Sequence, residues 1–269
     1  MKQRAFTLIE LLVVIAIVGI LSSVIYTNIQ GLRERAKITA GIRFDSSTLH
    51  SIGDQLVGEW TFDWPLVGGL TPDTSGSGSN GTLVGSPATT TGYNNKGAYD
   101  FDGTDDYVDV GNNANLSPTQ AITVTMWLYF EETSPSWLFV LGKGGFERGY
   151  GFCMNNSLSN FGFSINGNVV KAKTAISSGV WNFWVGTYDK QNVKLYKDGV
   201  LVNSVAYTAD MVSVADNFRI GRAGYGSGTK TYTKGIFDDI RVYSSALSSS
   251  DIQKLYAEGV SSHPNLANK

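Results

Sequence analysis

Thr123-Val124-Thr125-Met126-Trp127-Leu128 alternates threonine and tryptophan with aliphatic side chains at every second position. Successive side chains of a β-strand point to opposite faces of the sheet. The alternation therefore predicts a strand, from Ile122 to Phe130, in a sheet that lies between two different environments.

Further short strand-like runs surround this stretch and are separated by turns. They are Val57–Phe62, Trp137–Leu141, Gly149–Met154, Phe161–Ile165, Trp181–Tyr188, Val193–Tyr196, Leu201–Ala206, Asn217–Gly221 and Ile236–Tyr243. Between two of them lies Lys197-Asp198-Gly199-Val200, and Asp-Gly suits a type I′ hairpin turn. Regular strand spacing without alternating helices predicts a mainly β fold, an antiparallel sandwich of jelly-roll type.

One short helix is expected at the C-terminal end. Ser248 precedes Asp251 by three positions, which is typical of a capping box. Ile252 and Leu255 form an apolar face, and Gly259 suits the position after the last helical residue.

Composition limits the possible functions. The 269 residues carry a net charge of −2 and no basic stripe, which argues against a nucleic-acid partner. Cys153 is the only cysteine, so no intramolecular disulfide can form. An exported chain of this kind depends on core burial, metal binding or polymer contacts for its stability.

The N-terminal segment is basic and then strongly apolar. After Lys2 and Arg4, the run from Leu11 to Leu32 has no charge and would be about 33 Å long as a helix, enough to cross a bilayer. A secretory signal peptide would have a shorter apolar run and a small-residue cleavage site. A plain membrane anchor would not explain Glu10, because a carboxylate at the edge of an apolar helix is costly to bury.

Lys2-Gln3-Arg4-Ala5 followed by Phe6-Thr7-Leu8-Ile9-Glu10-Leu11-Leu12-Val13 resembles the processing motif of type IV pilins and type II secretion pseudopilins. The resemblance implies cleavage after Ala5 by a prepilin peptidase and N-methylation of Phe6, although the family usually has Gly before the cut. It also implies that Glu10 pairs with the N-terminal amine of a neighbouring subunit. A charge pair in a low dielectric is strong, so Glu10 would set the register of assembly.

The resemblance covers about the first 35 residues and implies a leader at 1–5, followed by a hydrophobic transmembrane and assembly helix at 6–56. The change from a helical to an alternating pattern near residue 57 predicts a β-sandwich at 57–260, and the polar residues 261–269 predict a loose tail. The precursor is expected to cross the inner or cytoplasmic membrane once, with the head outside. It would then join identical or related pilin subunits in a surface filament or a periplasmic pseudopilus.

Several segments of the head together resemble the laminin-G-like, concanavalin A-like jelly-roll superfamily. They are residues 58–63, 73–83, 98–108, 123–128, 181–189, 195–199 and 238–243. That fold hosts lectins, adhesion modules and hydrolases, so it does not decide function.

Catalytic chemistry is not expected. Hydrolases of this fold need two carboxylates on the concave face, but the sequence has no strand with acidic residues at alternate positions. Glu131 and Glu132 follow a strand and are better interpreted as a solvated loop, and His50 and His263 lie outside the head core. We therefore expect a binding or structural protein rather than an enzyme.

Calcium is the expected cofactor if one is present, because hard cations prefer carboxylate, amide and carbonyl oxygens. The resemblance implies a structural Ca²⁺ held near the 73–80 loop and the final strand, at Asp63, Asp73, Asn80 and Asp238. The alternative is that Asp73 and Asn80 are only turn residues. A second acidic loop, residues 102–106, is expected to be a hairpin connection.

A sugar site would need exposed aromatic rings. The candidates near loops are Trp64, Trp137, Phe146, Tyr150, Tyr225 and Tyr232, whereas the expected core aromatics are Trp60, Trp127, Trp181 and Trp184. The leading hypothesis is a filament subunit that displays a lectin-like, adhesive domain. The alternatives are a pseudopilin of a secretion or DNA-uptake machine and, with less weight, a membrane-tethered glycan hydrolase.

Overall fold

A computed structural model describes residues 52–63, 69–131, 138–145, 148–154, 157–167, 170–222 and 232–261. The chain divides into two units, Met1–Ser51 and Ile52–Lys269, and every described residue belongs to the second unit. Ala5, Phe6, Glu10 and the expected transmembrane helix up to residue 51 thus lie outside the described residues. Within the described part, no helix combines the length and apolarity needed to cross a membrane.

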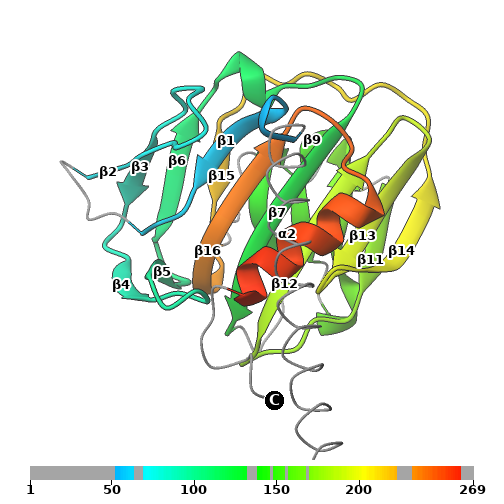
Figure 1. The fold of residues 1–269 in the computed structure, drawn as a ribbon. Coiled ribbons are helices and arrows are strands. Elements are labelled where there is room, and N and C mark those ends of the chain that lie inside the picture. The colour runs from blue at the N-terminus through cyan, green and yellow to red at the C-terminus, as the bar shows by residue number, and fades with distance from the viewer. Residues whose placement is uncertain are drawn as a thin grey trace, which may run out of the picture. The chain divides into compact units, whose positions relative to one another are not determined.

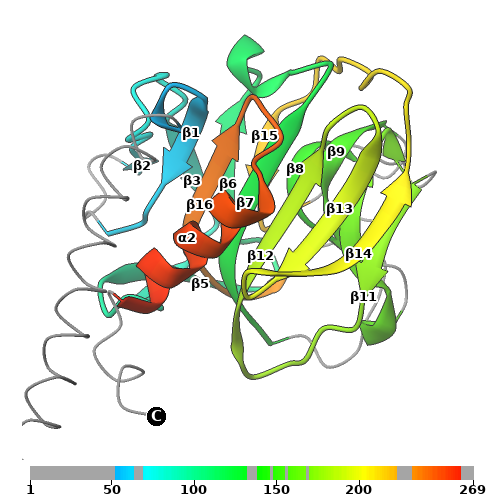
Figure 2. The ribbon, with the colours of Figure 1, turned by 45° about the vertical axis from the view of Figure 1, so that its right-hand side comes forward.

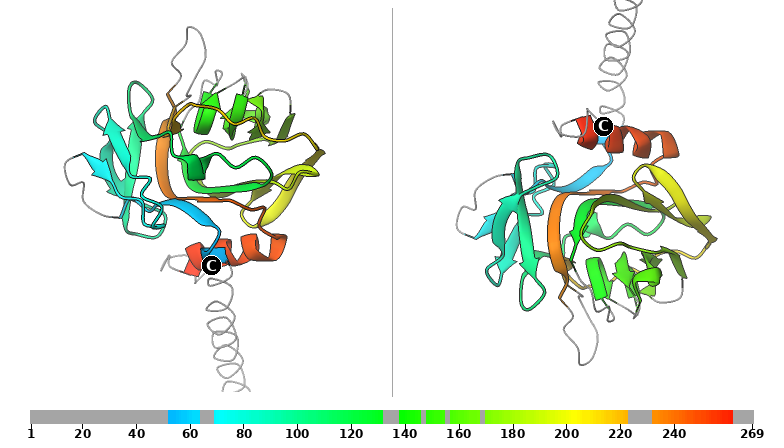
Figure 3. Two further views of the ribbon diagram at one scale, coloured as in Figure 1. Left: turned by 90° about the horizontal axis from the view of Figure 1, so that it is seen from above. Right: turned by 90° about the horizontal axis from the view of Figure 1, so that it is seen from below.

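Two antiparallel sheets pack face to face, as the end-on views in Figure 3 show. The first has the strand order β14-β13-β12-β7-β16-β5-β4, and β1 also pairs with β16. Its strands are β1 (Leu56–Trp60), β4 (Ala88–Thr91), β5 (Gly97–Asp102), β7 (Ile122–Phe130), β12 (Trp181–Tyr188), β13 (Asn192–Lys197), β14 (Val200–Ala206) and β16 (Lys234–Tyr243).

The second sheet has the order β11-β10-β9-β8-β15-β6-β3-β2. Its strands are β2 (Leu70–Thr71), β3 (Gly81–Val84), β6 (Tyr107–Gly111), β8 (Leu138–Gly145), β9 (Arg148–Met154), β10 (Phe161–Ile165), β11 (Val170–Thr174) and β15 (Phe218–Ile220). The short 3₁₀ helices Ala114–Leu116 and Leu158–Asn160 lie in connections. The predicted antiparallel jelly-roll sandwich is confirmed.

Strand β7 lies between two apolar environments. Val124, Met126 and Leu128 are buried in the core between the sheets, whereas Trp127 is buried on the outer face in a second cluster. The alternation in its sequence therefore separates two buried faces rather than a buried face from a solvated one.

The turn between β13 and β14 follows the prediction. Asp198 and Gly199 have φ angles of 51° and 78°, as a type I′ turn requires at both central positions. The Asp198 carboxylate also accepts a hydrogen bond from the backbone N–H of Phe183, which ties the turn to β12.

The helix α2 (Ser249–Ser261) covers the outer face of the first sheet (Figures 1 and 2). Its start is the predicted capping box, because Ser248 Oγ accepts from the Asp251 N–H at 3.2 Å and donates to the Asp251 carboxylate at 2.6 Å. The expectation for Gly259 was wrong, since the helix continues to Ser261. Gly259 is needed for packing instead: a Cβ there would lie 2.7 Å from a ring carbon of Trp127.

Candidate functional site: a carboxylate cluster at the bulge of β16

Two of the four predicted calcium ligands, Asp63 and Asp238, come together in the structure. Asp63 follows the end of β1, and Asp238 lies on β16, the strand with which β1 pairs. Trp60 lies opposite Ile240 in this ladder, which brings the two segments side by side. The charge of Asp63 contributes to the raised pKa of Asp238.

A third carboxylate, Asp239, joins them through a bulge in β16. The register with β7 shifts between Asp238 and Arg241, and Asp239 has a φ angle of 46°. Phe237 and Ile240 both belong to the core between the sheets, so the bulge holds two consecutive aspartates between two inward-pointing residues. Asp239 is not among the predicted ligands, although an Asp-Asp pair inside an apolar strand is a signal that points to it.

The turn between β4 and β5 closes the cluster from another side. The backbone N–H of Tyr93 donates to Asp238 Oδ2 at 2.9 Å. A Cβ on the preceding residue, Gly92, would lie 2.2 Å from the same oxygen. Glycine is therefore required for the turn to approach the carboxylate this closely.

Unfavourable backbone conformations surround the cluster. Phe62, Asn95 and Asp239 have φ angles of 57°, 62° and 46°, and each comes from a different one of the three segments. Non-glycine residues with positive φ are uncommon, and such conformations concentrate at functional sites because surrounding contacts hold them in place.

The cluster has more negative charge than its neighbours neutralise. Asp238 is 0% exposed, and among the described residues its Oδ1 and the buried Oδ1 of Asp63 have no hydrogen-bond partner. Burial, followed by repulsion from Asp239 and Asp63, raises the pKa of Asp238 to about 8. Lys96 Nζ lies 3.2 Å from Asp63 Oδ2, but the lysine side chain is 64% exposed and compensates weakly.

The donor atoms of these three residues are of the kind that a hard divalent cation prefers. Unpartnered buried carboxylate oxygens are costly unless a proton or a cation compensates them. Asp63, Asp238 and Asp239 supply oxygen ligands only, which calcium prefers and softer metals do not. Among the described residues, the three carboxylates whose oxygens lie within 4.8 Å of one another are Asp102, Asp105 and Asp106, so Asp63, Asp238 and Asp239 would hold an ion only if their side chains moved closer together.

The other two predicted ligands, Asp73 and Asn80, form hydrogen bonds within the 73–80 loop instead. Asp73 Oδ1 accepts from the N–H groups of Glu59 and Ser75, and its Oδ2 accepts from the N–H of Ser79. Asn80 Oδ1 accepts from the N–H of Asp73 at 2.9 Å. These bonds are those of turn-forming residues, so the structure supports the turn alternative for this pair.

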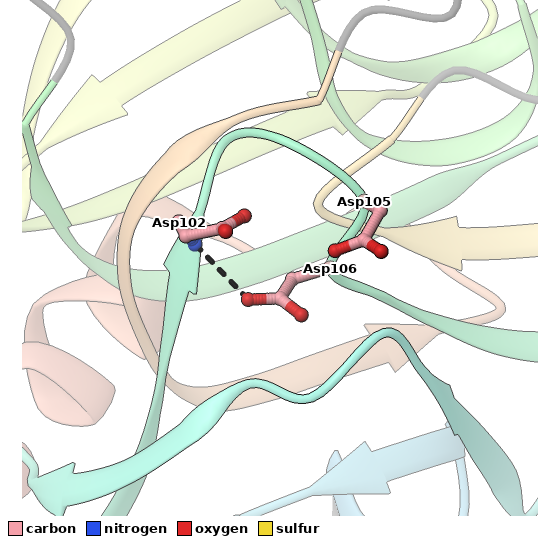
Figure 4. A group of neighbouring side chains, drawn as sticks. All are labelled: Asp102, Asp105 and Asp106. Carbon is pink, nitrogen blue, oxygen red and sulfur yellow. Dashed lines mark hydrogen bonds between the residues drawn. The ribbon is translucent and has the colours of Figure 1, made fainter.

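Figure 4 shows the second acidic loop, where carboxylate oxygens of Asp102, Asp105 and Asp106 lie within 4.8 Å of one another. Asp106 accepts from the N–H groups of Ser86 and Asp102, at 2.7 and 3.1 Å. The loop borders a pocket of about 590 Å³. The expected hairpin was wrong: β5 belongs to the first sheet and β6 to the second, so the loop connects the two layers.

The division of the aromatic residues into buried and exposed ones differs in part from the prediction. Trp60, Trp127 and Trp184 are buried as predicted, whereas Trp181 is partly exposed. Tyr150, expected near a loop, is buried, and its hydroxyl donates to the Leu116 carbonyl at 2.9 Å. Tyr232 is half-buried beside Arg222. The remaining loop candidates lie outside the described residues: Trp64, Trp137, Phe146 and Tyr225.

Comparison with known families decides the assignment of the head. A family model described as the concanavalin A-like lectin/glucanases superfamily matches residues 102–253, which is more than half of the chain. The chain belongs to this superfamily. A second family model, the prokaryotic N-terminal methylation motif, matches residues 1–26. The chain is therefore a member of the lectin/glucanase superfamily with a pilin-type N-terminus.

Solved structures share the fold of this superfamily member. A botulinum neurotoxin type C structure, concerned with two ganglioside molecules in cell entry, matches with a TM-score of 0.61 and 13% identity over 78% of this chain. The match spans 53% of the toxin chain, so this chain corresponds to about half of it. Domain 4 of AbnA, a GH43 extracellular arabinanase from Geobacillus stearothermophilus in complex with arabinotriose, matches with a TM-score of 0.60 and 19% identity, over 75% of this chain and 98% of that domain.

A sialidase from Trypanosoma rangeli in complex with sialic acid has a TM-score of 0.58 and 16% identity, over 76% of this chain and 33% of the sialidase. No curated protein sequence matches the chain. At these identities the likeness establishes the fold, while the N-terminal motif indicates a membrane-anchored precursor that is processed by a prepilin peptidase. Together, the motif and the lectin-like fold favour a non-enzymatic role.

Proposed function

We propose that the chain is a subunit of a type IV pilus-like surface filament whose head is an adhesive, glycan-binding module. One observation carries the proposal: a methylation motif at residues 1–26 and a lectin-type domain at 102–253 occur in the same chain. The first builds a subunit into a polymer, and the second provides a fold that presents binding surfaces.

Processing after Ala5 would leave a methylated Phe6 at the new N-terminus. Glu10 would then pair with this amine on a neighbouring subunit, in a low-dielectric setting where an unpaired charge is heavily penalised. Glu10→Val should abolish incorporation into sheared filaments while leaving the membrane-bound precursor at its normal level. Normal incorporation of Glu10→Val would refute this assembly role, and Glu10→Asp is the matched control that retains the charge.

Calcium is part of the proposal. An ion held by Asp63, Asp238 and Asp239 would join the end of β1 to the bulge of β16, which the β4–β5 turn contacts through the N–H of Tyr93. When bound, it supplies the positive charge that the unpartnered carboxylate oxygens lack. Because β1 is the first strand after the N-terminal unit, the ion would stabilise the part of the head that carries load from the filament.

A pseudopilin of a secretion or DNA-uptake machine is the second candidate, since the same N-terminal motif serves both assemblies. Copy number distinguishes them: a filament subunit should be abundant in purified surface filaments, whereas a pseudopilin should stay with the cell envelope. The sialidase and arabinanase structures keep a third candidate, a tethered glycan hydrolase, open to test. Release of reducing sugars from a polysaccharide panel by the purified chain would support it.

A further inference from the structure

The strand orders of the two sheets define two opposite sides of the sandwich. In the first sheet, β13 and β14 lie at one end and β5 and β4 at the other. In the second sheet, β10 and β11 lie at one end and β6, β3 and β2 at the other. Figures 1 and 2 show β11 and β14 together on one side of the head, away from β2 and β3.

The side formed by β10, β11, β13 and β14, which we call the lysine side, is positively charged. Residues 161–206, which include these strands, hold five lysines and two aspartates, a net charge of +3. Lys194 is paired with Asp189 at 2.7 Å, whereas Lys173 is exposed and has no ion pair among the described residues. The lysine side therefore has positive charge that its own carboxylates do not compensate.

The lysine side also exposes an apolar edge strand. Val200, Leu201 and Val202, at the start of β14, are 63%, 47% and 40% exposed. β14 ends the first sheet, and its seven residues include neither a charge nor a proline. Natural edge strands are usually protected by charged residues or proline, and an unprotected apolar edge pairs readily with another chain. This edge therefore indicates a protein-binding surface.

The opposite side, which we call the aspartate side, consists of β3–β6 and their connections. Residues 81–111, which include these strands, hold five aspartates and one lysine, a net charge of −4. The pocket of about 590 Å³ lies here, beside the loop shown in Figure 4, and one lysine, Lys234, contributes to its wall. The carboxylates of the wall are those of Asp100, Asp102, Asp105, Asp106 and Glu131. Among the described residues, none of these five forms an ion pair. A cleft lined by one sign of charge attracts groups of the other sign, such as lysine side chains.

The charges decide which surfaces of two copies of the head can meet. A contact between two lysine sides, or between two aspartate sides, would bring like charges together, which costs several kcal/mol. A head-to-tail contact brings opposite charges together and covers the exposed edge of β14. Such a heterologous contact repeats without closing when the rotation between copies does not close a ring, so it suits a filament.

We propose that the lysine side of one head binds the aspartate side of a second copy of this chain, its neighbour in the filament. The contact covers β14 and brings lysine charge against the carboxylates around the 590 Å³ pocket. This proposal rests on the proposed filament function and names the two surfaces through which the heads meet. It gives the acidic 102–106 loop a protein partner.

The test is thiol cross-linking of full-length chains in intact surface filaments. Val200→Cys places a thiol on the lysine side and Asp105→Cys one on the aspartate side, while the native Cys153 is only 1% exposed. A bis-maleimide reagent should join chains of the double variant into a ladder of multimers, and each single variant should stay monomeric. Gln253→Cys combined with Asp105→Cys is the matched control, because Gln253 is exposed on α2, over the face of the first sheet, and should give no ladder.

Charge reversal gives a second readout. Lys173→Glu and Asp105→Lys should each lower the yield of filaments by about tenfold or more, because like charges then meet in every contact. Both substitutions in one chain should restore the yield, since the two charges are exchanged across the contact. A folding defect in either variant would not be repaired in this way.

Other outcomes overturn the proposal in distinguishable ways. Dimers of the single variant Val200→Cys would show a contact between two lysine sides, and a ladder from the Gln253 control alone would place the contact on α2. Normal filament yield in both charge variants, with no cross-linking of Val200→Cys to Asp105→Cys, would show that the two sides do not meet. In each of these cases the filament function stands. If the wild-type chain occurs in no surface filament, the filament function fails and the head-to-tail contact fails with it.

Discussion

The backbone N–H of Tyr93 donates a hydrogen bond to Asp238 Oδ2 at 2.9 Å, across 145 positions of sequence. The Asp238 carboxylate is fully buried, and its other oxygen, Oδ1, has no hydrogen-bond partner among the described residues. The arrangement leaves Asp238 half satisfied, which is the condition under which a buried carboxylate gains most from a cation.

Asp238→Asn should affect the stability of the metal-free protein and of the calcium-bound protein differently. Without metal, the variant should be more stable than the wild type at neutral pH, because the wild-type carboxyl group must take up a proton on folding at that pH and a neutral amide need not. With calcium at a hundredfold excess over its Kd, the wild type should gain about 2.7 kcal/mol, and the variant should gain little. Thermal unfolding in calcium and in EDTA measures both effects. Asp54→Asn, at an exposed position outside both acidic groups, is the control and should respond to calcium as the wild type does.

The pH dependence of the metal-free protein has a definite sign. Folding raises the pKa of Asp238 from its ordinary value of 3.8 to about 8, so the folded state favours the protonated form. This contribution is fully present below about pH 4 and is lost as the pH rises towards 8. The free energy of unfolding should therefore fall across that window, by up to about 1.4 kcal/mol per pH unit for this one proton. Excess calcium should reverse the trend, because cation and proton compete for the same oxygens. A pH profile unchanged by Asp238→Asn would contradict this account.

Substitution of Asp73 should lower stability without changing the response to calcium, in contrast to Asp238→Asn. Asp73→Ala removes the acceptor of three backbone N–H groups in a partly buried loop, and we expect a loss of about 2 kcal/mol in unfolding free energy. The calcium-dependent gain in stability should stay the same, since Asp73 lies outside the carboxylate cluster. Denaturant unfolding in calcium and in EDTA tests both statements, and loss of the calcium response would return Asp73 to the ligand set.

Gly259→Ala should destabilise the head although alanine is the better helix former. The new Cβ would lie 2.7 Å from the Trp127 ring, and overpacking typically costs about 1–3 kcal/mol, more than the gain of about 1 kcal/mol in helix propensity. Gly53→Ala is the matched control, because a Cβ there meets nothing within 4 Å. Tryptophan fluorescence during denaturant unfolding would report the difference, and equal stability of the two variants would argue against the Trp127 contact.

The sequence was sufficient for features that are encoded locally. The period-2 pattern predicts β7 and β12 with their observed bounds, and Asp198-Gly199 predicts its turn, because strand faces and turn angles depend on adjacent residues. Pairing between distant strands is not encoded in this way. The loop between Asp102 and Tyr107 has the composition of a hairpin turn, yet its strands belong to different sheets.

Asp63 and Asp238 were predicted from the sequence but Asp239 was not, because contacts between distant segments decide which residues come together. Asp73 and Asn80 were grouped with Asp63 through family resemblance, but their own backbone contacts satisfy them. Asp239 was missed because its role depends on a bulge, and a bulge is fixed by the neighbouring strands rather than by the strand itself.

Mass analysis of the N-terminus of the protein recovered from sheared surface filaments tests the central claim most directly. The account predicts a chain that lacks residues 1–5 and begins with N-methylated Phe6. A chain that retains Met1 and is found in the membrane fraction but not in the filaments would contradict it.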